Sequence, residues 1–162
     1  MGAKASGRHQ AAVIPFRIGA QDRIEVLLIR RKVRTKWSVP KGWIERGQTP
    51  REAAMCEAVE EAGALGELSP HPVGQFQHDK AGRKRDVQVF LLRVVQLQLQ
   101  YAERRIRERE WFALADAAVR ARPDAVCDLI RRLPTLIRRG PRGQVAFVRT
   151  PPASADDPAD AD

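Results

Sequence analysis

Three glutamates, Glu57, Glu60 and Glu61, lie three and four residues apart near the centre of the first hundred residues. Residues at this spacing are neighbours on one face of a helix, so we expect their carboxylates to converge. Hard divalent cations such as Mg²⁺ prefer oxygen ligands and keep part of their water, which leaves room for a phosphate group. The spacing therefore favours a metal site that handles phosphates, although clustered glutamates on an arbitrary helix usually form a solvated face.

Local start and stop signals predict the helix that carries these glutamates. Thr49, Pro50 and Glu52 form a capping box with proline at the first helical position. Gly63 suits the left-handed residue that ends a helix. We therefore expect a helix over residues 50–62. Its apolar side would comprise Ala54, Met55, Ala58, Val59 and Ala62.

The run from Gly42 to Ala64, GWIERGQTPREAAMCEAVEEAGA, resembles the Nudix box, the signature of metal-dependent diphosphate hydrolases. The preceding WSVPKGW and the fixed loop spacing favour this interpretation over a solvated helix face. The residues that fall on the positions of the pattern are Gly42, Glu57, Glu60, Glu61 and Gly63.

The match departs from the pattern at two charged positions. Gln48 replaces its first glutamate and Cys56 replaces its arginine, while Ala58 and Ala64 stand in for larger aliphatics. In the pattern the two missing residues carry opposite charges that could support each other or orient the neighbouring glutamate. Here both positions are neutral, so no unpaired charge is implied. We therefore expect a folded, metal-binding protein with low but measurable hydrolysis.

The resemblance also implies a set of metal-binding and catalytic residues. It implies that Glu57, Glu60 and Glu61 bind Mg²⁺ or Mn²⁺ and act in catalysis, and that the backbone carbonyl of Lys41 adds a ligand. Glu57 and Glu61 would be direct ligands, and Glu60 would bridge metals or hold the nucleophilic water. The family often recruits one more carboxylate from outside the box. The candidates, which the sequence does not rank, are Glu103, Glu108 and Glu110.

Basic residues are the second feature of the sequence that points to phosphates. The net charge is +9 and the pI is about 10.5, a balance that attracts polyanions. Arginine grips phosphate with two parallel hydrogen bonds, whereas lysine acts as a point charge. Three clusters of basic residues lie within residues 30–36, 80–85 and 104–109. Each cluster alone is about as compatible with solvated loop charge as with phosphate contact, but three clusters in loops around one acidic site favour substrate binding. The candidate substrate-binding residues are Arg30, Lys36, Lys41, Arg83, Lys84, Arg85, Arg107 and Arg109.

The fold predicted from the resemblance is α/β, a Nudix-type α/β/α sandwich with a mixed sheet. The resemblance covers about Ala11 to Ile137, and the segments beginning at Val73 and Arg105 are similar to the diphosphoinositol and diadenosine polyphosphate hydrolase branch. Periodicity predicts strands at 11–18, 24–30, 37–39, 72–78, 86–98 and 110–113, a basic hairpin tip at 79–85, and helices at 114–121 and 124–139.

The bulk properties predict one domain with short tails. A chain of 162 residues suits a single core, which we place at residues 10–149. We expect a flexible tail at residues 1–9 and a disordered, acidic, Pro/Ala-rich tail at 150–162. No signal peptide or membrane span is visible, which favours a cytoplasmic protein. Cys56 and Cys127 are interpreted as small buried hydrophobes. A monomer and a homodimer remain equally compatible with the sequence.

Three functions fit these observations. The first is metal-dependent hydrolysis of diphosphate linkages in diadenosine or diphosphoinositol polyphosphates, by attack of water on phosphorus. The second is a catalytically weakened domain that binds or senses a phosphorylated ligand, supported by Gln48 and Cys56. The third is RNA binding, which charge alone supports and which we do not favour. Trp43 could stack on a base, although packing at the core or rim is the better supported interpretation.

Overall fold

The structure is a computed structural model that describes residues 9–149 of the chain. The predicted acidic tail, and the predicted N-terminal tail up to residue 8, lie outside the described residues. His9 belongs to the first strand instead of to a tail. None of the helices within residues 9–149 has both the length and the apolar character needed to cross a membrane.

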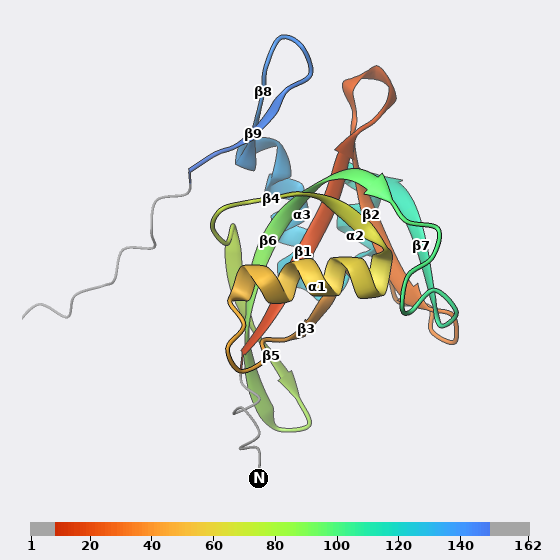
Figure 1. Cartoon of the computed structure of the whole chain (residues 1–162), viewed down its shortest axis with the longest axis vertical. Coiled ribbons are helices and arrows are strands. Elements are labelled where there is room, and N and C mark those ends of the chain that lie inside the picture. The colour runs from red at the N-terminus through yellow and green to blue at the C-terminus, as the bar shows by residue number, and fades with distance from the viewer. Residues whose placement is uncertain (1–8, 150–162) are drawn as a thin grey trace, which may run out of the picture.

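The described chain forms nine strands, three α-helices and one 3₁₀ turn, shown in Figure 1. The strands are β1 (His9–Ile18), β2 (Ile24–Arg31), β3 (Lys41–Trp43), β4 (Ala64–Leu68), β5 (Gly74–Lys80), β6 (Arg83–Leu97), β7 (Arg107–Ala113), β8 (Ile137–Arg139) and β9 (Val145–Phe147). The helical elements are η1 (Ala20–Asp22), α1 (Pro50–Ala62), α2 (Leu114–Arg120) and α3 (Asp124–Leu136).

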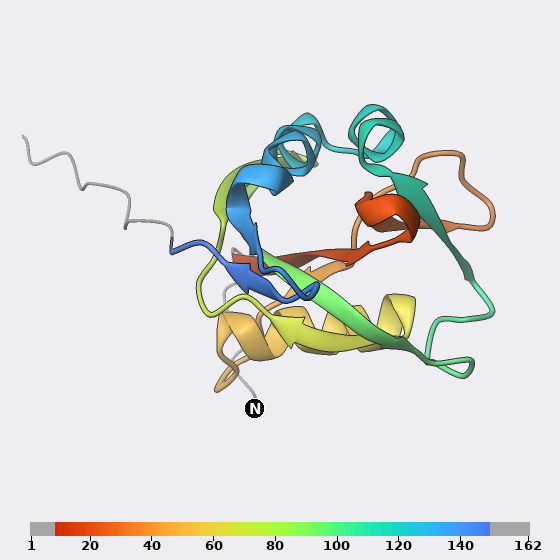
Figure 2. The same ribbon diagram turned by 90° about the horizontal axis from the view of Figure 1, so that it is seen from above.

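A seven-stranded mixed sheet lies at the centre of the fold. Its main path is β4-β6-β1-β2-β7, with β3 paired to β1 and β5 paired to β6. Strands β1 and β6 are parallel, and the other pairs are antiparallel. Helix α1 covers one face of the sheet, and α2 and α3 cover the other, as Figure 2 shows. The predicted α/β/α sandwich with a mixed sheet is therefore confirmed.

The alternation of side chains along β1 creates one hydrophobic core on each face of the sheet. Ile14 and Phe16 join the core under α2 and α3, whereas Ala11 and Val13 join the core under α1. Successive strand residues point to opposite faces, so one strand serves both cores. The buried residues of α1 that complete the second core are all alanines: Ala53, Ala54, Ala58 and Ala62. Small side chains allow the helix to lie close to the sheet.

Helix α1 occupies the predicted residues, and its two ends are built as predicted. The Thr49 side chain accepts a hydrogen bond from the backbone N–H of Glu52 at 3.1 Å, and the Glu52 carboxylate accepts one from the backbone N–H of Thr49 at 2.9 Å. Gly63 ends the helix with φ of 60°. These caps satisfy backbone groups that a helix end leaves without partners.

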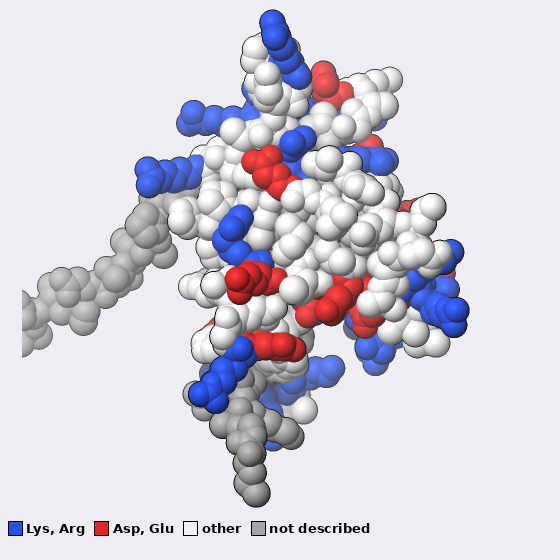
Figure 3. Space-filling view, in the orientation of Figure 1, with Lys and Arg blue, Asp and Glu red and all other residues white. Residues whose placement is uncertain are grey.

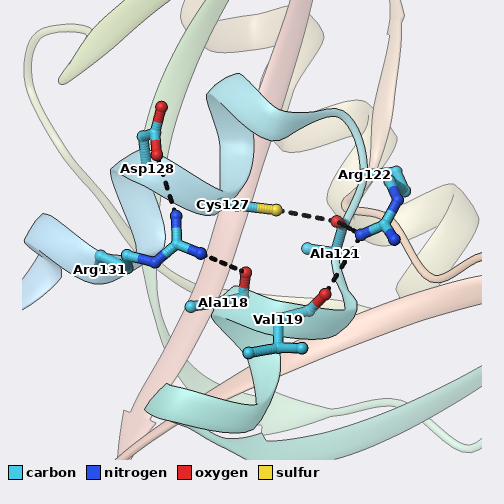
Figure 4. Close-up of polar contacts among 7 residues, drawn as sticks. All are labelled: Ala118, Val119, Ala121, Arg122, Cys127, Asp128 and Arg131. Atoms are coloured by element: carbon cyan, nitrogen blue, oxygen red, sulfur yellow. Dashed lines mark hydrogen bonds and ion pairs between the residues drawn. The ribbon is translucent and has the colours of Figure 1, made fainter.

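The two cysteines differ in burial, so one prediction is confirmed and one is wrong. Cys127 is buried in α3, and its Sγ contacts the carbonyl oxygen of Ala121 at 2.8 Å. Figure 4 shows this contact in the junction between α2 and α3, where Arg122 donates to the same carbonyl. Cys56 is exposed, because it lies on the side of α1 that faces away from the sheet.

Several predicted boundaries are wrong. The helix predicted at 124–139 ends at Leu136, and the chain continues into the β8–β9 hairpin. Residues 37–39 form only isolated bridges, of Trp37 with Ala121 and of Ser38 with Ile29. Strands β5 and β6 pair as far as Lys80 and Arg83, so the predicted basic tip lies largely within strands. Strand β4 was not predicted. Short strands such as β4 and β8 depend on their partners more than on their own sequence.

Candidate active site

Helix α1 and strand β3 bring Glu57 against Gly42. A Cβ atom built on Gly42 would collide with the carboxylate of Glu57. Strand β3 is held in place by pairing with β1, in which Ala11 lies opposite Gly42. Only glycine therefore leaves room for the Glu57 carboxylate between the helix and the strand. The first residue of the sequence motif thus positions one of its glutamates.

Glu57 and Glu61 form a hydrogen-bonded carboxyl pair. Burial raises the pKa of Glu57 and raises the pKa of Glu61 to about 8. The hydrogen bond between them lowers the pKa of Glu57, whereas the charge of Glu57 and the same hydrogen bond raise the pKa of Glu61 further. Two carboxyl groups can hydrogen-bond directly only when one of them carries a proton. A nearby positive charge would therefore favour the ionised form of both carboxyls.

Arg107, at the start of β7, supplies part of that charge. Its Nη2 lies 3.4 Å from Glu61 Oε1, and its Nε donates to Glu103 Oε2 at 2.7 Å. The backbone N–H of Glu103 donates to the Glu60 carbonyl at 2.9 Å, which docks this segment on the last turn of α1. The negative charge of Glu103 raises the pKa of both Glu57 and Glu61. Glu103 is thus the carboxylate outside the motif that the fold brings to the pair.

The other two candidate carboxylates are placed differently. Glu108 pairs with Arg30 at 2.7 Å across strands β2 and β7, and Glu110 is exposed on β7. Glu60 is also exposed, although its charge still raises the pKa of Glu57. The three glutamates of the helix therefore adjoin one another, with two buried or partly buried and the third facing solvent.

The donor chemistry fits Mg²⁺ or Mn²⁺. Within residues 9–149, no three Asp, Glu, His or Cys side chains are arranged as a ready-made metal cage. Glu57 and Glu61 are instead paired with each other, and Arg107 contacts Glu61. The side-chain donors are nevertheless all carboxylate oxygens, which Mg²⁺ prefers. Their raised pKa values show that the ionised carboxylates are destabilised, and a bound cation would stabilise them. The backbone carbonyl of Lys41 is next to Gly42, which contacts Glu57.

A basic cluster, which we define as Lys41, Lys80 and Arg85, adjoins the carboxyl pair. Burial lowers the pKa of Lys41, the charge of Glu61 opposes this, and Arg85 and Lys80 lower that pKa further. Lys41 therefore lies within electrostatic reach of both the carboxylates and the β5–β6 hairpin. The pKa of His78 is lowered by burial and then by the same three cations.

Trp43 lies beside the basic cluster. The guanidinium of Arg85 stacks over its ring at 4.5 Å, and the indole remains 39% exposed. The Nε of Arg85 is buried without a hydrogen-bond partner within the described residues. Trp43 is therefore a rim residue that orients an arginine.

In Figure 3, acidic side chains gather below the centre of the viewed face, with Lys and Arg on either side.

The remaining predicted phosphate-binding residues lie in several places. Arg83 and Lys84 are exposed at the start of β6, and Lys36 is exposed in the loop after β2. Arg30 pairs with Glu108 and stacks over Trp37 at 4.6 Å.

Arg109 holds the end of α1. Its Nη1 donates to the Ala62 carbonyl at 2.8 Å, and its guanidinium stacks over Tyr101 at 4.6 Å. The structure thus gives Arg109 structural partners, and a phosphate contact for it stays a prediction. Sequence reasoning missed this arrangement, as it missed the joint action of Glu103 and Arg107. Their spacing of four residues was the one available signal.

Comparison with known proteins identifies the family. Diphosphoinositol polyphosphate phosphohydrolase 3-alpha of Mus musculus is 37% identical over 114 residues, which cover 68% of this chain and 66% of that protein. Diphosphoinositol polyphosphate phosphohydrolase 3-beta of Homo sapiens is 36% identical over 114 residues, with the same coverage. The chain thus spans just under two thirds of the length of these relatives. The crystal structure of C. elegans Ap4A hydrolase has the same fold, with a TM-score of 0.64 at 24% identity, covering 79% of this chain and 96% of that chain. Because the NUDIX domain model matches residues 7–130, well over half of the chain, this protein belongs to the Nudix family.

Proposed function

We propose that this protein hydrolyses diphosphate linkages in highly phosphorylated small molecules, with Mg²⁺ or Mn²⁺ bound at Glu57, Glu60 and Glu61. The observation that carries this proposal is the position of β3, where Gly42 lies against the Glu57 carboxylate and the next residue, Trp43, packs under the guanidinium of Arg85. An acidic site that binds a cation and a basic site that binds phosphates therefore share one boundary. That arrangement suits a substrate that carries several phosphate groups.

The residues of the site have different roles in the proposed reaction. Lys41, Lys80 and Arg85 bind and orient the phosphate chain, because these three cations act on one another and the Nε of Arg85 has no partner in the described residues. Glu60 orients the attacking water, because its carboxylate faces solvent next to the buried pair. The bound metal would neutralise phosphate charge and lower the pKa of a coordinated water. Gly42 keeps the Glu57 carboxylate in place.

Two substrate classes are the first to test. The names of the relatives point to diphosphoinositol polyphosphates, and that of the structural neighbour points to Ap4A, a dinucleoside polyphosphate. Both classes carry runs of phosphate that suit the basic cluster. Exposed Arg83 and Lys84 extend the positive charge along the same hairpin. A cytoplasmic location and a monomeric or homodimeric state stay predictions.

The test is a screen of phosphate release from both substrate classes and from simple nucleotides, with Mg²⁺ and with Mn²⁺. We expect metal-dependent release that Glu57→Gln abolishes while the protein stays folded. Glu67→Gln is the matched control, because Glu67 is an exposed carboxylate on β4 that pairs with Arg93. Activity that survives Glu57→Gln would reject the site, and no release from any substrate would reject the hydrolase function.

The second candidate function is binding or sensing of a phosphorylated ligand without efficient turnover. The observation that favours it is the neutral contact between Gln48 and Cys56, at positions that are charged in the Nudix pattern. A ligand that binds only the native state raises its stability, so thermal stabilisation without turnover would select this function. RNA binding with steep salt dependence, and with no effect of the small ligands, would instead select the nucleic-acid alternative.

A further inference from the structure

Arg107 is held between two carboxylates that lie in different parts of the fold. It is 3.4 Å from Glu61 on α1 and 2.7 Å from Glu103 in the segment before β7. The Arg107 and Glu61 side chains are 13% and 10% exposed, and the Glu103 side chain is 29% exposed. The bridge is therefore largely withdrawn from water, where charge–charge interactions are strong.

The backbone holds this bridge in position. The N–H of Glu103 donates to the Glu60 carbonyl at 2.9 Å, and the N–H of Arg107 donates to the Glu103 carbonyl at 3.0 Å. Arg107 is also the first residue of strand β7, where it pairs with Arg31 of β2. Backbone hydrogen bonds and strand pairing therefore fix the segment from which the guanidinium reaches Glu61.

This bridge conflicts with cation binding at the same carboxylate. A divalent cation on Glu61 would repel a guanidinium that contacts the same group at 3.4 Å. The shorter contact, at 2.7 Å, is to Glu103. Arg107 can therefore release Glu61 and keep Glu103 without leaving its charge unpaired.

We propose that Arg107 is a built-in counter-ion that competes with the divalent cation for Glu61, and that Glu103 is the partner that retains it after release. The inference rests on the proposed metal site. Arg107 stabilises the protein without bound metal and weakens its affinity for the divalent cation. It therefore raises the cation concentration at which the site becomes half-occupied. This makes Arg107 a positioning residue, with no contact to substrate required.

The primary test measures Mn²⁺ binding by calorimetry, and thermal unfolding with and without Mn²⁺, in the full chain without substrate. Arg107→Met should lower the Tm of the metal-free protein, tighten Mn²⁺ binding about fivefold or more, and widen the Mn²⁺-induced rise in Tm. Arg105→Met is the matched control, because it removes the same charge from an exposed position in the same segment. Its Mn²⁺ affinity should stay within about twofold of the native value.

Substitution of Glu103 should change the Mn²⁺ affinity in the opposite direction to Arg107→Met. It therefore distinguishes retention of Arg107 by Glu103 from direct ligation of the cation by Glu103. Glu103→Gln should weaken Mn²⁺ binding, because Arg107 would then keep its contact with Glu61. In the Arg107→Met background the same change should have little effect on Mn²⁺ affinity. A Glu103 that ligates the cation would weaken binding equally in both backgrounds, and that result would overturn the assigned role of Glu103.

The outcomes are separable from the fate of the proposed function. Unchanged or weaker Mn²⁺ binding by Arg107→Met, beside normal binding by the native protein, would overturn the inference and leave the metal site intact. No Mn²⁺ binding by the native protein would reject the metal site itself. If Arg107→Met fails to fold, Arg107→Lys keeps the charge but loses the forked contact, and it should tighten Mn²⁺ binding by a smaller factor.

Discussion

The side-chain amide of Gln48 donates a hydrogen bond to the Sγ of Cys56 at 3.5 Å. The carbonyl oxygen of the same amide accepts from the backbone N–H of Glu45 at 3.1 Å, which orients the side chain. The two residues that depart from the Nudix pattern are therefore in contact. A neutral pair stands where the pattern has a glutamate and an arginine, and it joins the loop before α1 to the second turn of the helix.

Restoring the charged pair should raise activity cooperatively. We expect Cys56→Arg to raise kcat/KM, and Gln48→Glu to raise it more in the presence of Cys56→Arg than alone. The reason is that support next to a metal ligand is typically worth about 10–100-fold in affinity or activity. A double-mutant cycle in kcat/KM measures the coupling. No gain from Cys56→Arg, together with additive effects, would contradict this prediction.

The stability of the metal-free protein should fall as pH rises. Burial raises the pKa of Glu61 to about 8 from an ordinary value of 4.5, although Arg107 opposes the shift. Between these values the folded state holds a proton that the unfolded state has released, so the stability contributed by this group is lost as pH increases. Thermal unfolding in a chelator from pH 5 to pH 8 measures the effect. Glu61→Gln should flatten the dependence and raise the metal-free Tm at pH 8. Parallel pH profiles for the two proteins would contradict the assignment.

The basic hairpin should matter more for substrates with more phosphates. Neutralising Arg83, Lys84 and Arg85 together should raise KM for a long polyphosphate far more than for a nucleoside diphosphate derivative. Arg85→Gln alone should account for most of the effect, because Arg85 lies beside Lys41 and stacks on Trp43. The Arg83→Gln/Lys84→Gln pair, at exposed positions, should account for the smaller part of the rise in KM. Equal changes in KM for both substrates would identify the hairpin as ordinary surface.

Gly42→Ala should damage the site more than the fold. The added methyl would occupy the space of the Glu57 carboxylate, which must then move. A displacement of about 1 Å at a catalytic group can reduce the rate about 100-fold, so we expect a loss of that order in kcat. Circular dichroism and Tm report the fold independently. Native turnover by a folded Gly42→Ala protein would show that Glu57 does not need this position.

Arg109→Met should lower stability without changing substrate binding. The substitution removes the hydrogen bond to the Ala62 carbonyl and the stack on Tyr101. An unsatisfied buried carbonyl costs about 1–3 kcal/mol, which a denaturant titration detects. KM should stay native for both long and short polyphosphates. A raised KM with unchanged stability would instead restore the phosphate contact predicted from the sequence.

Local signals were sufficient to predict helix α1 and the shared face of Glu57 and Glu61. The capping box of Thr49 and Glu52, and the left-handed Gly63, act within one turn of the helix ends. The spacing of Glu57 and Glu61 places them on one helix face whatever surrounds the helix. For the same reason the central strands, with long apolar or alternating patterns, were found near their observed positions.

The partners of the charged residues were decided by the tertiary structure. Arg107 meets Glu61 and Arg109 meets Ala62 only because strand β7 pairs with β2 beside the end of α1. Cys56 is exposed because the sheet covers a different side of α1, whereas Cys127 faces the opposite core. A sequence shows which side chains carry charge, but burial and pairing depend on segments that are distant in the chain. The same burial raises the pKa of the Glu61 carboxyl, so a nearby cation would stabilise its ionised form.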